Sequence, residues 1–443
     1  SGRLISCFLG AMADIIKPDL CVIGAGALGL SLARRASARG LDVVLVARPG
    51  PEPGDAPQGR LRRAALMASA ARAQALRSAG ALGLDKAEPK LNFRAVAAHA
   101  AAMAKAGASR DTPERLAALG VRLIEGEGEF VAPGRFAIGQ TIIRARHFAL
   151  AMGSEAVVPP LPELDKVAFF TPDSIAGNIR KLTHLLVIGG TPEAFELAQA
   201  YRRLGAQVSL VPQGGPLPGF APEPVALLLR ALREEGLDIL DDAEVSAIQP
   251  RRQGIGIALM RADGPASLDV SHILVAMGRR NQGSEIVDRR VTRLADEPHI
   301  AERQAALLVE RLAGHGPGRL SPEALPRFVL TEPALAQAGR IEPLRPGETL
   351  WRANLAENDA ARAMGEAQGL LALASGKGGR ISGGAAVGPG AVQIIALLAL
   401  CMEKGLSLSA VERLALPPVN LAAALIDIAG QYGARRPRRR LWW

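Results

Sequence analysis

The chain has 443 residues, too many for a single hydrophobic core, so roughly two to four domains are expected. Hydrophobic residues make up 49% and aromatic residues 3% of the chain, which excludes a disordered protein and predicts a largely aliphatic interior. The net charge is +10, and the three cysteines (Cys7, Cys21 and Cys401) include no C-x-x-C pair, which argues against a disulfide scaffold or a zinc site and predicts a cytoplasmic protein.

Residues 1–13 are interpreted as an N-terminal extension ahead of the first domain. The apolar stretch at 4–13 is too short to span a membrane, which needs roughly 18 to 20 apolar residues. We therefore expect neither a transmembrane helix nor a signal peptide here.

A glycine-rich turn follows the first expected strand. The strand covers residues 20–23, the turn reads Gly24-Ala25-Gly26-Ala27-Leu28-Gly29, a helix runs to about residue 39, and a second strand covers 43–46. Gly24 permits the tight turn, Gly26 lets the backbone approach a pyrophosphate, and Gly29 allows close packing of helix and strand. This order is typical of the first unit of a dinucleotide-binding fold.

The acid that usually holds the adenosine ribose at the end of the second strand is absent. Ala47 and Arg48 follow Val46 instead. We expect this change to weaken nucleotide binding without removing the phosphate-binding backbone. Downstream, helices are expected at 61–78 and 93–106, and short strands with turns across 120–153.

The same pattern returns about 165 residues later. A strand is expected at 185–188, a helix at 195–204 and a further strand at 208–211. The turn between the first two, Gly189-Gly190-Thr191-Pro192-Glu193-Ala194, has lost the second glycine to Thr191 and the third to Ala194. Either Gly189 and Gly190 still serve a nicotinamide dinucleotide, or the fold is retained without tight binding.

From about residue 321 the composition indicates an α+β domain. The expected strands are 328–330, 369–374 and 381–387, and the expected helices are 392–404 and 408–414. The arginine-rich tail 435–443 is expected to be solvated or to contact an anionic partner or a membrane surface. No aromatic-interleaved basic patch elsewhere supports specific binding of a nucleic acid.

Several ordered segments resemble the pyridine nucleotide-disulfide oxidoreductase family, which includes dihydrolipoamide dehydrogenase, mercuric reductase and glutathione reductase. The matching segments are 21–29, 151–154 (similar to A-T-G-S), 185–204, 275–280 (similar to V-A-T-G-R-R), 328–339 and 376–389. The resemblance implies an α/β fold of two Rossmann-like dinucleotide-binding domains and a C-terminal α+β dimerisation domain. It also implies FAD and NAD(P)H as cofactors and a homodimer.

On this resemblance, residues 14–155 and 279–316 form the FAD-binding-type domain and 156–278 the NAD(P)-binding-type domain. Residues 321–434 then form the dimerisation domain. Gly153 belongs to the segment similar to A-T-G-S, and Asp296 is matched to the aspartate that contacts the flavin, with an exposed loop acid as the alternative reading of Asp296. The stretch between Arg280 and Asp288 is shorter than in the family.

The departures from the family decide the expected chemistry. The positions of its C-x-x-x-x-C-x-x-x-K motif align with Asp55, Arg60 and Ala64. Glu196 retains the glutamate that pairs with the family's lysine. Disulfide exchange needs one thiolate to attack and a second sulfur to resolve, and this alignment supplies neither.

The C-terminal acid–base pair is also replaced. The segment that resembles H-P-T-L-x-E has Pro418 in place of the histidine and Ala423 in place of the glutamate. Proline cannot accept or return a proton.

Two functions remain from this reading. The first is an FAD-dependent oxidoreductase that passes electrons from NAD(P)H through flavin to a diffusible acceptor, without dithiol chemistry. The second is a catalytically inactive homologue that acts as a dimeric scaffold or complex subunit.

Overall fold

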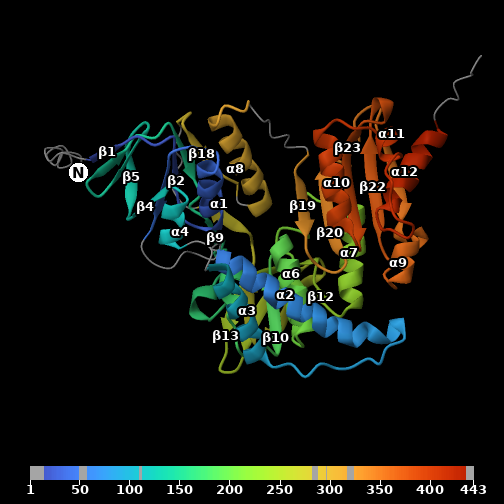
Figure 1. The fold of residues 1–443 in the computed structure, drawn as a ribbon. Helices are drawn as coiled ribbons and strands as arrows, with labels where there is room; N and C mark the ends of the chain where they lie inside the picture. Colours follow the sequence, from blue (N-terminus) through green and yellow to red (C-terminus); the bar gives the residue numbers. More distant parts are fainter. Residues whose placement is uncertain are drawn as a thin grey trace, which may run out of the picture. The chain divides into compact units, whose positions relative to one another are not determined.

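The computed structural model describes residues 14–48, 57–108, 112–281, 288–295, 297–316 and 324–435 (Figure 1). The chain divides into two compact units. The first comprises Ser1–Leu66, Ala95–Val157 and Arg279–Leu320, and the second comprises Met67–Arg94, Val158–Gly278 and Ser321–Trp443. Each unit is described below by itself.

A parallel five-stranded sheet forms the centre of the first unit, in the order β18-β8-β2-β3-β4. Its strands are β2 (Leu20–Ile23), β3 (Val43–Ala47), β4 (Val121–Glu125), β8 (His147–Leu150) and β18 (Val291–Arg293). The sequence of β2 is apolar without alternation because both of its faces are covered, and Leu20, Cys21 and Val22 are fully buried.

Two helices cover one face of this sheet. They are α1 (Ala27–Ser37) and α8 (Pro298–Leu312), and their apolar faces share one core with β2 and β3. At the edge of that contact Ser31 donates a hydrogen bond of 2.9 Å to Glu302, and Arg35 lies 3.3 Å from the same carboxylate. Helix α4 (Pro113–Ala118) packs against β4 and contributes Leu116 to the same core.

The opposite face packs against a smaller sheet in the order β1-β7-β6-β5. Its strands are β1 (Asp14–Ile16), β5 (Gly128–Ala132), β6 (Arg135–Ile138) and β7 (Thr141–Ile143). The ring of Phe130 makes edge-to-face contacts with Phe136 and Phe148, each with ring centroids 5.1 Å apart. Because aromatics are scarce in this chain, we infer that this cluster fixes how the two sheets stack.

The helices α2 (Pro57–Ser78) and α3 (Phe93–Ala108) follow β3. The expected helices at 61–78 and 93–106 are both present, with α2 beginning four residues earlier and α3 ending two later. Helix α2 contributes residues to both units, and the short 3-10 helix Ala79–Leu82 follows it. In the second unit Arg77 donates a 2.7 Å hydrogen bond to the carbonyl of Arg203, and this contact helps to place residues 67–94 there.

The second unit contains a parallel sheet in the order β12-β11-β10-β16. Its elements are β10 (His184–Ile188), α6 (Pro192–Arg203), β11 (Gln207–Val211), α7 (Pro222–Glu234), β12 (Asp238–Ile239) and β16 (His272–Val275), preceded by the 3-10 helix Leu164–Lys166 and α5 (Pro172–Ile175). An antiparallel sheet of β13 (Ala243–Pro250), β14 (Ile255–Arg261) and β15 (Gly264–Val270) shares a core with it. We did not expect α7 or the antiparallel sheet from sequence.

An antiparallel sheet with helices on it completes the second unit, in the strand order β19-β20-β23-β22-β21. The elements are β19 (Pro326–Val329), β20 (Ala334–Gly339), β21 (Thr349–Asn354), α9 (Asp359–Ala363), β22 (Leu370–Ser375), β23 (Ile381–Gly388), α10 (Ala391–Glu403), α11 (Leu408–Val411) and α12 (Ala423–Ala434), with the 3-10 helices Leu355–Glu357 and Lys377–Gly379. Helix α11 ends three residues before the predicted 408–414, because Arg413 and Leu414 make the shorter i→i+3 bonds of a closing turn. The predicted fold class, two Rossmann-like sheets and a C-terminal α+β domain, is confirmed.

Side chains on α6 join the two parts of the second unit. Gln199 accepts a 2.9 Å hydrogen bond from the backbone of Glu332, and Arg203 pairs with Glu235 at 2.6 Å and also with Glu332. Across the same junction Gln337 accepts a 2.8 Å bond from the backbone of Ala221. Among the helices that the structure describes, none is long and apolar enough to cross a membrane.

Candidate functional site: a pocket at a glycine turn

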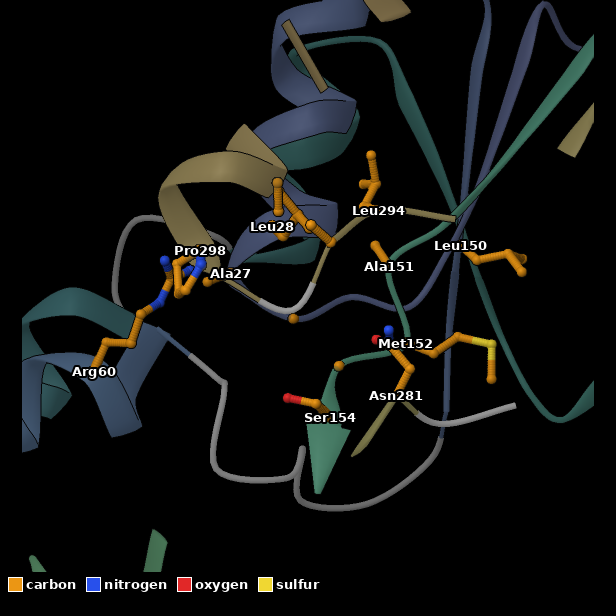
Figure 2. Close-up of a pocket in the computed structure, with 14 residues that line it drawn as sticks. Ala27, Leu28, Arg60, Leu150, Ala151, Met152, Ser154, Asn281, Leu294 and Pro298 are labelled. Atoms are coloured by element: carbon orange, nitrogen blue, oxygen red, sulfur yellow. The ribbon is translucent and has the colours of Figure 1, made fainter. Parts of the chain in front are cut away.

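A pocket lies at the carboxyl edge of the parallel sheet of the first unit (Figure 2). The three neighbouring strands β18, β8 and β2 all end there, so the loops that follow them are brought together by topology. The crevice beyond the carboxyl ends of such strands is where open α/β sheets bind ligands. The lining residues are Gly26, Ala27, Leu28, Arg60, Leu150, Ala151, Met152, Gly153, Ser154, Asn281, Leu294, Ala295, Pro298 and Ala301.

The glycine turn after β2 has no room for side chains at two positions. A Cβ atom on Gly24 (φ +109°) would lie 2.2 Å from the carbonyl oxygen of Ala151. A Cβ atom on Gly29 would lie 1.8 Å from the carbonyl oxygen of Gly24. These two glycines hold β2, its turn and α1 against the loop after β8, and Gly26 between them faces the pocket.

Gly26 is the N-cap of α1, and the first turn of this helix offers its N–H groups to the pocket. No side chain caps this end of the helix, and no acidic residue lies in its first turn. Gly26, Ala27 and Leu28 all line the pocket. Unsatisfied N–H groups at the positive end of a helix dipole are the ordinary protein site for phosphate.

A second helix begins at the same pocket. Glu297 is the N-cap of α8 and makes no side-chain cap, and Pro298 in the first turn lines the pocket together with Ala301. The loop before α8 is held in place because the N–H of Ala295 donates a 2.7 Å hydrogen bond to Gln304. The positive ends of two helix dipoles therefore lie at one cavity.

The wall formed by the loop after β8 is fixed by an arginine outside the pocket. Gly153 adopts a left-handed conformation (φ +73°), which turns the chain into β9 (Ser154–Ala156). Arg279, at the start of β17 (Arg279–Asn281), donates 2.8 Å hydrogen bonds to the hydroxyl and to the carbonyl of Ser154. Asn281 pairs in register with Ser154, and both residues line the pocket.

Arg60 enters the pocket from the first turns of α2. It is the only charged side chain among the described residues that line this cavity. Figure 2 shows its guanidinium directed toward Ala27 and Pro298, the first residues of α1 and α8. A cation and two helix N-termini thus face the same space, and this combination attracts an anion.

The pocket fits the pyrophosphate of a dinucleotide better than it fits the adenosine ribose. The glycine cradle, the uncapped helix and Arg60 are all suited to phosphate oxygens. At the end of β3, however, Ala47 is 9% exposed and Arg48 is exposed, so no carboxylate of β3 is available for the ribose hydroxyls.

The second glycine turn, in the second unit, repeats the packing of the first. Gly189 (φ +144°) would place a Cβ atom 2.1 Å from the carbonyl oxygen of Ala276, which follows β16. Gly190 is covered by the loop after β11, because a Cβ atom on it would lie 1.9 Å from the carbonyl oxygen of Gly215. The N–H of Leu217 closes this loop on the turn with a 2.8 Å bond to the carbonyl of Gly190.

The start of α6 differs from the start of α1. Thr191 is the N-cap, and its hydroxyl accepts a 3.3 Å bond from the N–H of Ala194 and donates a 2.9 Å bond to the carbonyl of Ala276. Pro192 has no N–H to offer, and Glu193 places a carboxylate in the first turn. Fewer donors are therefore free for an anion here than at the first turn.

The remaining residues singled out from sequence are distributed along the chain. Asp55 and Asp296 lie outside the described residues. Ala64 is exposed on α2, and Glu196 on α6 accepts a 2.8 Å hydrogen bond from the N–H of Leu330. Pro418 is an exposed loop residue, and Ala423 is the first residue of α12.

The two cysteines in the described part of the chain are core residues. Cys21 lies in β2 and Cys401 in α10, and both are buried and free. Burial raises the pKa of each thiol above its ordinary value, which leaves the thiolate form scarce.

Sequence reasoning missed part of the pocket. It did not assign Asn281, Pro298 or Arg60 to the lining of the pocket. The start of α8 carries a readable signal, since proline favours the first turn of a helix and Pro298 follows a short strand. Asn281 and Arg60 reach the pocket only through tertiary structure.

Comparison with known proteins agrees with this architecture. Residues 18–293 match the family model described as pyridine nucleotide-disulphide oxidoreductase. Among curated proteins, the chain is 25% identical to mercuric reductase of Streptomyces lividans over 92% of this chain and 94% of that protein. It is 30% identical to a dihydrolipoyl dehydrogenase of Pseudomonas aeruginosa over 74% of this chain and 77% of that protein.

Solved structures show the same fold. The crystal structure of LpdA from Mycobacterium tuberculosis superposes with a TM-score of 0.80 at 19% identity, covering 93% of this chain and 99% of that one. The HOCl-induced flavoprotein disulfide reductase RclA from Escherichia coli, in its Cu(II) complex, has a TM-score of 0.78 at 18% identity, covering 94% and 99%. Family members are FAD- and NAD(P)H-dependent flavoproteins, which agrees with the predicted class of cofactor. The sequence match over residues 18–293, together with this fold, shows that the chain belongs to the pyridine nucleotide-disulphide oxidoreductase family.

Proposed function

We propose that this protein is an FAD-binding member of its family that carries out no dithiol–disulfide exchange. The observation that carries the first half is the start of α1, where Gly26 leaves the helix uncapped inside a pocket without acidic side chains among its described lining residues. FAD bound there would supply hydride and electron transfer through its flavin ring. The chain's own part is to hold the pyrophosphate between the glycine turn and the N-terminus of α8.

The second half of the proposal follows from the cysteines. Dithiol exchange requires an accessible thiolate and a second sulfur within reach of it. Cys21 and Cys401 are buried in separate units of the fold, and on the resemblance drawn from the sequence Asp55 and Arg60 stand at the positions of the family's paired cysteines. On the same resemblance, Pro418 and Ala423 stand at the positions of the residues that would exchange protons with a dithiol substrate.

NAD(P)H is expected to bind more weakly than FAD. The start of α6 has its threonine cap, its proline and its carboxylate where a pyrophosphate would need donors. Two candidate functions follow. The first is NAD(P)H-driven electron transfer through the flavin to a diffusible acceptor, which needs only modest nucleotide affinity. The second is a homodimeric scaffold or complex subunit joined through residues 321–434, and the start of α6 favours it.

The decisive experiment uses the purified full chain. We expect a yellow protein with the absorbance of oxidised flavin, or a colourless one that becomes yellow on reconstitution with FAD. Anaerobic addition of NADH or NADPH then separates the two candidates, because bleaching supports electron transfer and an unchanged spectrum supports the scaffold. Turnover of lipoamide or glutathione disulfide would contradict the proposed loss of disulfide chemistry, and a chain that cannot be loaded with FAD would contradict the cofactor.

A further inference from the structure

Among the described residues that line the pocket, Arg60 is a cation with no acidic neighbour. Neither an ion pair nor a hydrogen bond joins its guanidinium to another residue in the described ranges. It is only partly exposed, although a lone arginine on a helix surface normally extends into water. Figure 2 shows it turned toward the first residues of α1 and α8.

We propose that Arg60 binds the pyrophosphate of the dinucleotide at the first glycine turn. This proposal rests on the function proposed above and identifies the side chain that completes its anion site. Sequence comparison treats position 60 only as a lost cysteine. The geometry points instead to a binding role, because the Arg60 side chain lines the pocket at which the uncapped helix α1 begins.

The chemistry of the three groups is complementary. The first turn of α1 directs N–H groups at the cavity, and α8, whose first residue Pro298 has no N–H, contributes mainly the positive end of its dipole. These partial charges alone do not neutralise a pyrophosphate. A guanidinium supplies a full charge and a planar fork of donors that matches two phosphate oxygens. No carboxylate among the described lining residues competes for it.

The missing ribose acid makes this contact more important. With Ala47 at the end of β3, the adenosine end of the ligand has lost a charged hydrogen-bond partner. A larger share of the affinity must then come from the phosphates. We therefore expect binding to fall with rising salt concentration, because a charge pair carries it.

The test measures FAD dissociation constants by quenching of flavin fluorescence, at low and high salt, for the wild-type chain and three variants. We expect Arg60→Ala to weaken FAD binding by about 10- to 100-fold, the effect of removing one charge-assisted hydrogen-bonded group. Arg60→Lys, which keeps the charge and loses the fork, should fall about threefold to tenfold. Arg62→Ala, two residues along the same helix and absent from the pocket lining, is the matched control and should bind like wild type.

Thermal melting of the unloaded variants checks that Arg60→Ala folds normally, and the salt dependence of FAD binding should be smaller in Arg60→Ala than in wild type. Equal affinity of Arg60→Ala and wild type would overturn the proposal, and so would an equal loss in Arg62→Ala. Failure of the wild type to bind FAD would instead overturn the proposed function. In that case inorganic pyrophosphate tests the anion site by itself. A rise in melting temperature in wild type but not in Arg60→Ala would support the site, and no rise in wild type would overturn the proposal for Arg60 as well.

Discussion

The two glycine turns have the same backbone packing and different helix starts. Gly24 and Gly189 donate backbone hydrogen bonds of 2.9 Å to the neighbouring strand, at Val46 and Val211. Each lies against a carbonyl, that of Ala151 or Ala276, with no room for a Cβ atom. The first glycine of such a motif therefore serves the fold in both units, whether or not a nucleotide binds.

The difference lies in the three residues that follow. Gly26-Ala27-Leu28 leaves the start of α1 uncapped and without charge, whereas Thr191-Pro192-Glu193 caps the start of α6, removes one donor and adds a carboxylate. A turn can thus keep its fold-determining glycine and lose its affinity for phosphate. The comparison teaches that the helix cap, more than the glycine count, reports whether such a turn binds an anion.

The largest expected effect concerns the shared feature. Gly24→Ala and Gly189→Ala should each lower the free energy of unfolding of their unit by about 3 to 5 kcal/mol, since both combine a left-handed backbone with a backbone clash. Chemical denaturation measures this loss.

The matched controls for these variants are Gly40→Ala and Gly214→Ala. Both glycines also have a left-handed backbone, with φ of +78° and +83°, but a Cβ atom on either would stand in open space. We expect each control to cost about 1 kcal/mol, from backbone strain alone. A small loss in only one of the Gly24 and Gly189 variants would break the claim that the two turns are packed alike.

The next largest expected effect is a dependence of stability on pH, caused by histidines at the amino ends of the two parallel sheets. His147, the first residue of β8, is buried and shares a 2.8 Å hydrogen bond with Thr292. Burial, reinforced by the charge of Arg311, lowers its pKa from 6.5 to about 4. Below pH 6.5 the native state then binds fewer protons than the unfolded state. The contribution of His147 to the free energy of unfolding is therefore fully present above pH 6.5 and is lost as the pH falls toward 4, by about 3 kcal/mol.

His184, the first residue of β10, sharpens this comparison. Burial also lowers the pKa of His184, but this side chain is less buried than His147, and a hydrogen bond with the backbone of Asp269 and the charge of Asp238 both oppose the shift, so its pH effect should be smaller. Urea midpoints between pH 7 and pH 4 measure both effects. We expect His147→Gln to flatten the profile more than His184→Gln, and equal profiles for the two variants would contradict the assignment.

The smallest expected effect tests the difference between the turns. Replacing Thr191-Pro192-Glu193 by Gly-Ala-Leu restores a donor and removes a carboxylate at the start of α6. We expect NADH or NADPH to bind about 30-fold more tightly, measured by fluorescence titration, because each of the two changes contributes about 1 kcal/mol. Glu244→Gln, an exposed charge change elsewhere in the same unit, is the control. Unchanged affinity would show that the loop over Gly190, rather than the helix cap, governs the second turn.

The sequence predicted the parts of the fold that local patterns specify. The strands β2, β3, β10 and β11 are short apolar runs bounded by glycine turns, and each was expected within a residue of its observed bounds. Strand β20 was missed because Ala334–Gly339 contains alanine and glycine, which have little intrinsic preference for strands and are held there by β19 and β23. Helix α12 was not predicted: the sequence interpretation assigned its first residue, Ala423, to the end of a motif and proposed no element for the residues after it.

The pocket was predictable only where it is built from one motif. Gly26 and Gly153 follow strands in a recognisable order, and the pocket brings them together. Arg60 and Asn281 come from elements distant in sequence, so their shared location depends on the packing of α2 and of β17.

The pairing of β9 with β17 has a consequence for how this chain can vary. The polypeptide leaves the first unit just after β9 and re-enters it at β17, and these two strands are antiparallel partners, with Arg279 opposite Ala156. Everything between them is therefore attached like the loop of a hairpin, through two adjacent ends. Such an attachment tolerates small changes of length where the chain leaves and re-enters the first unit, while Ser154 and Asn281 keep their positions.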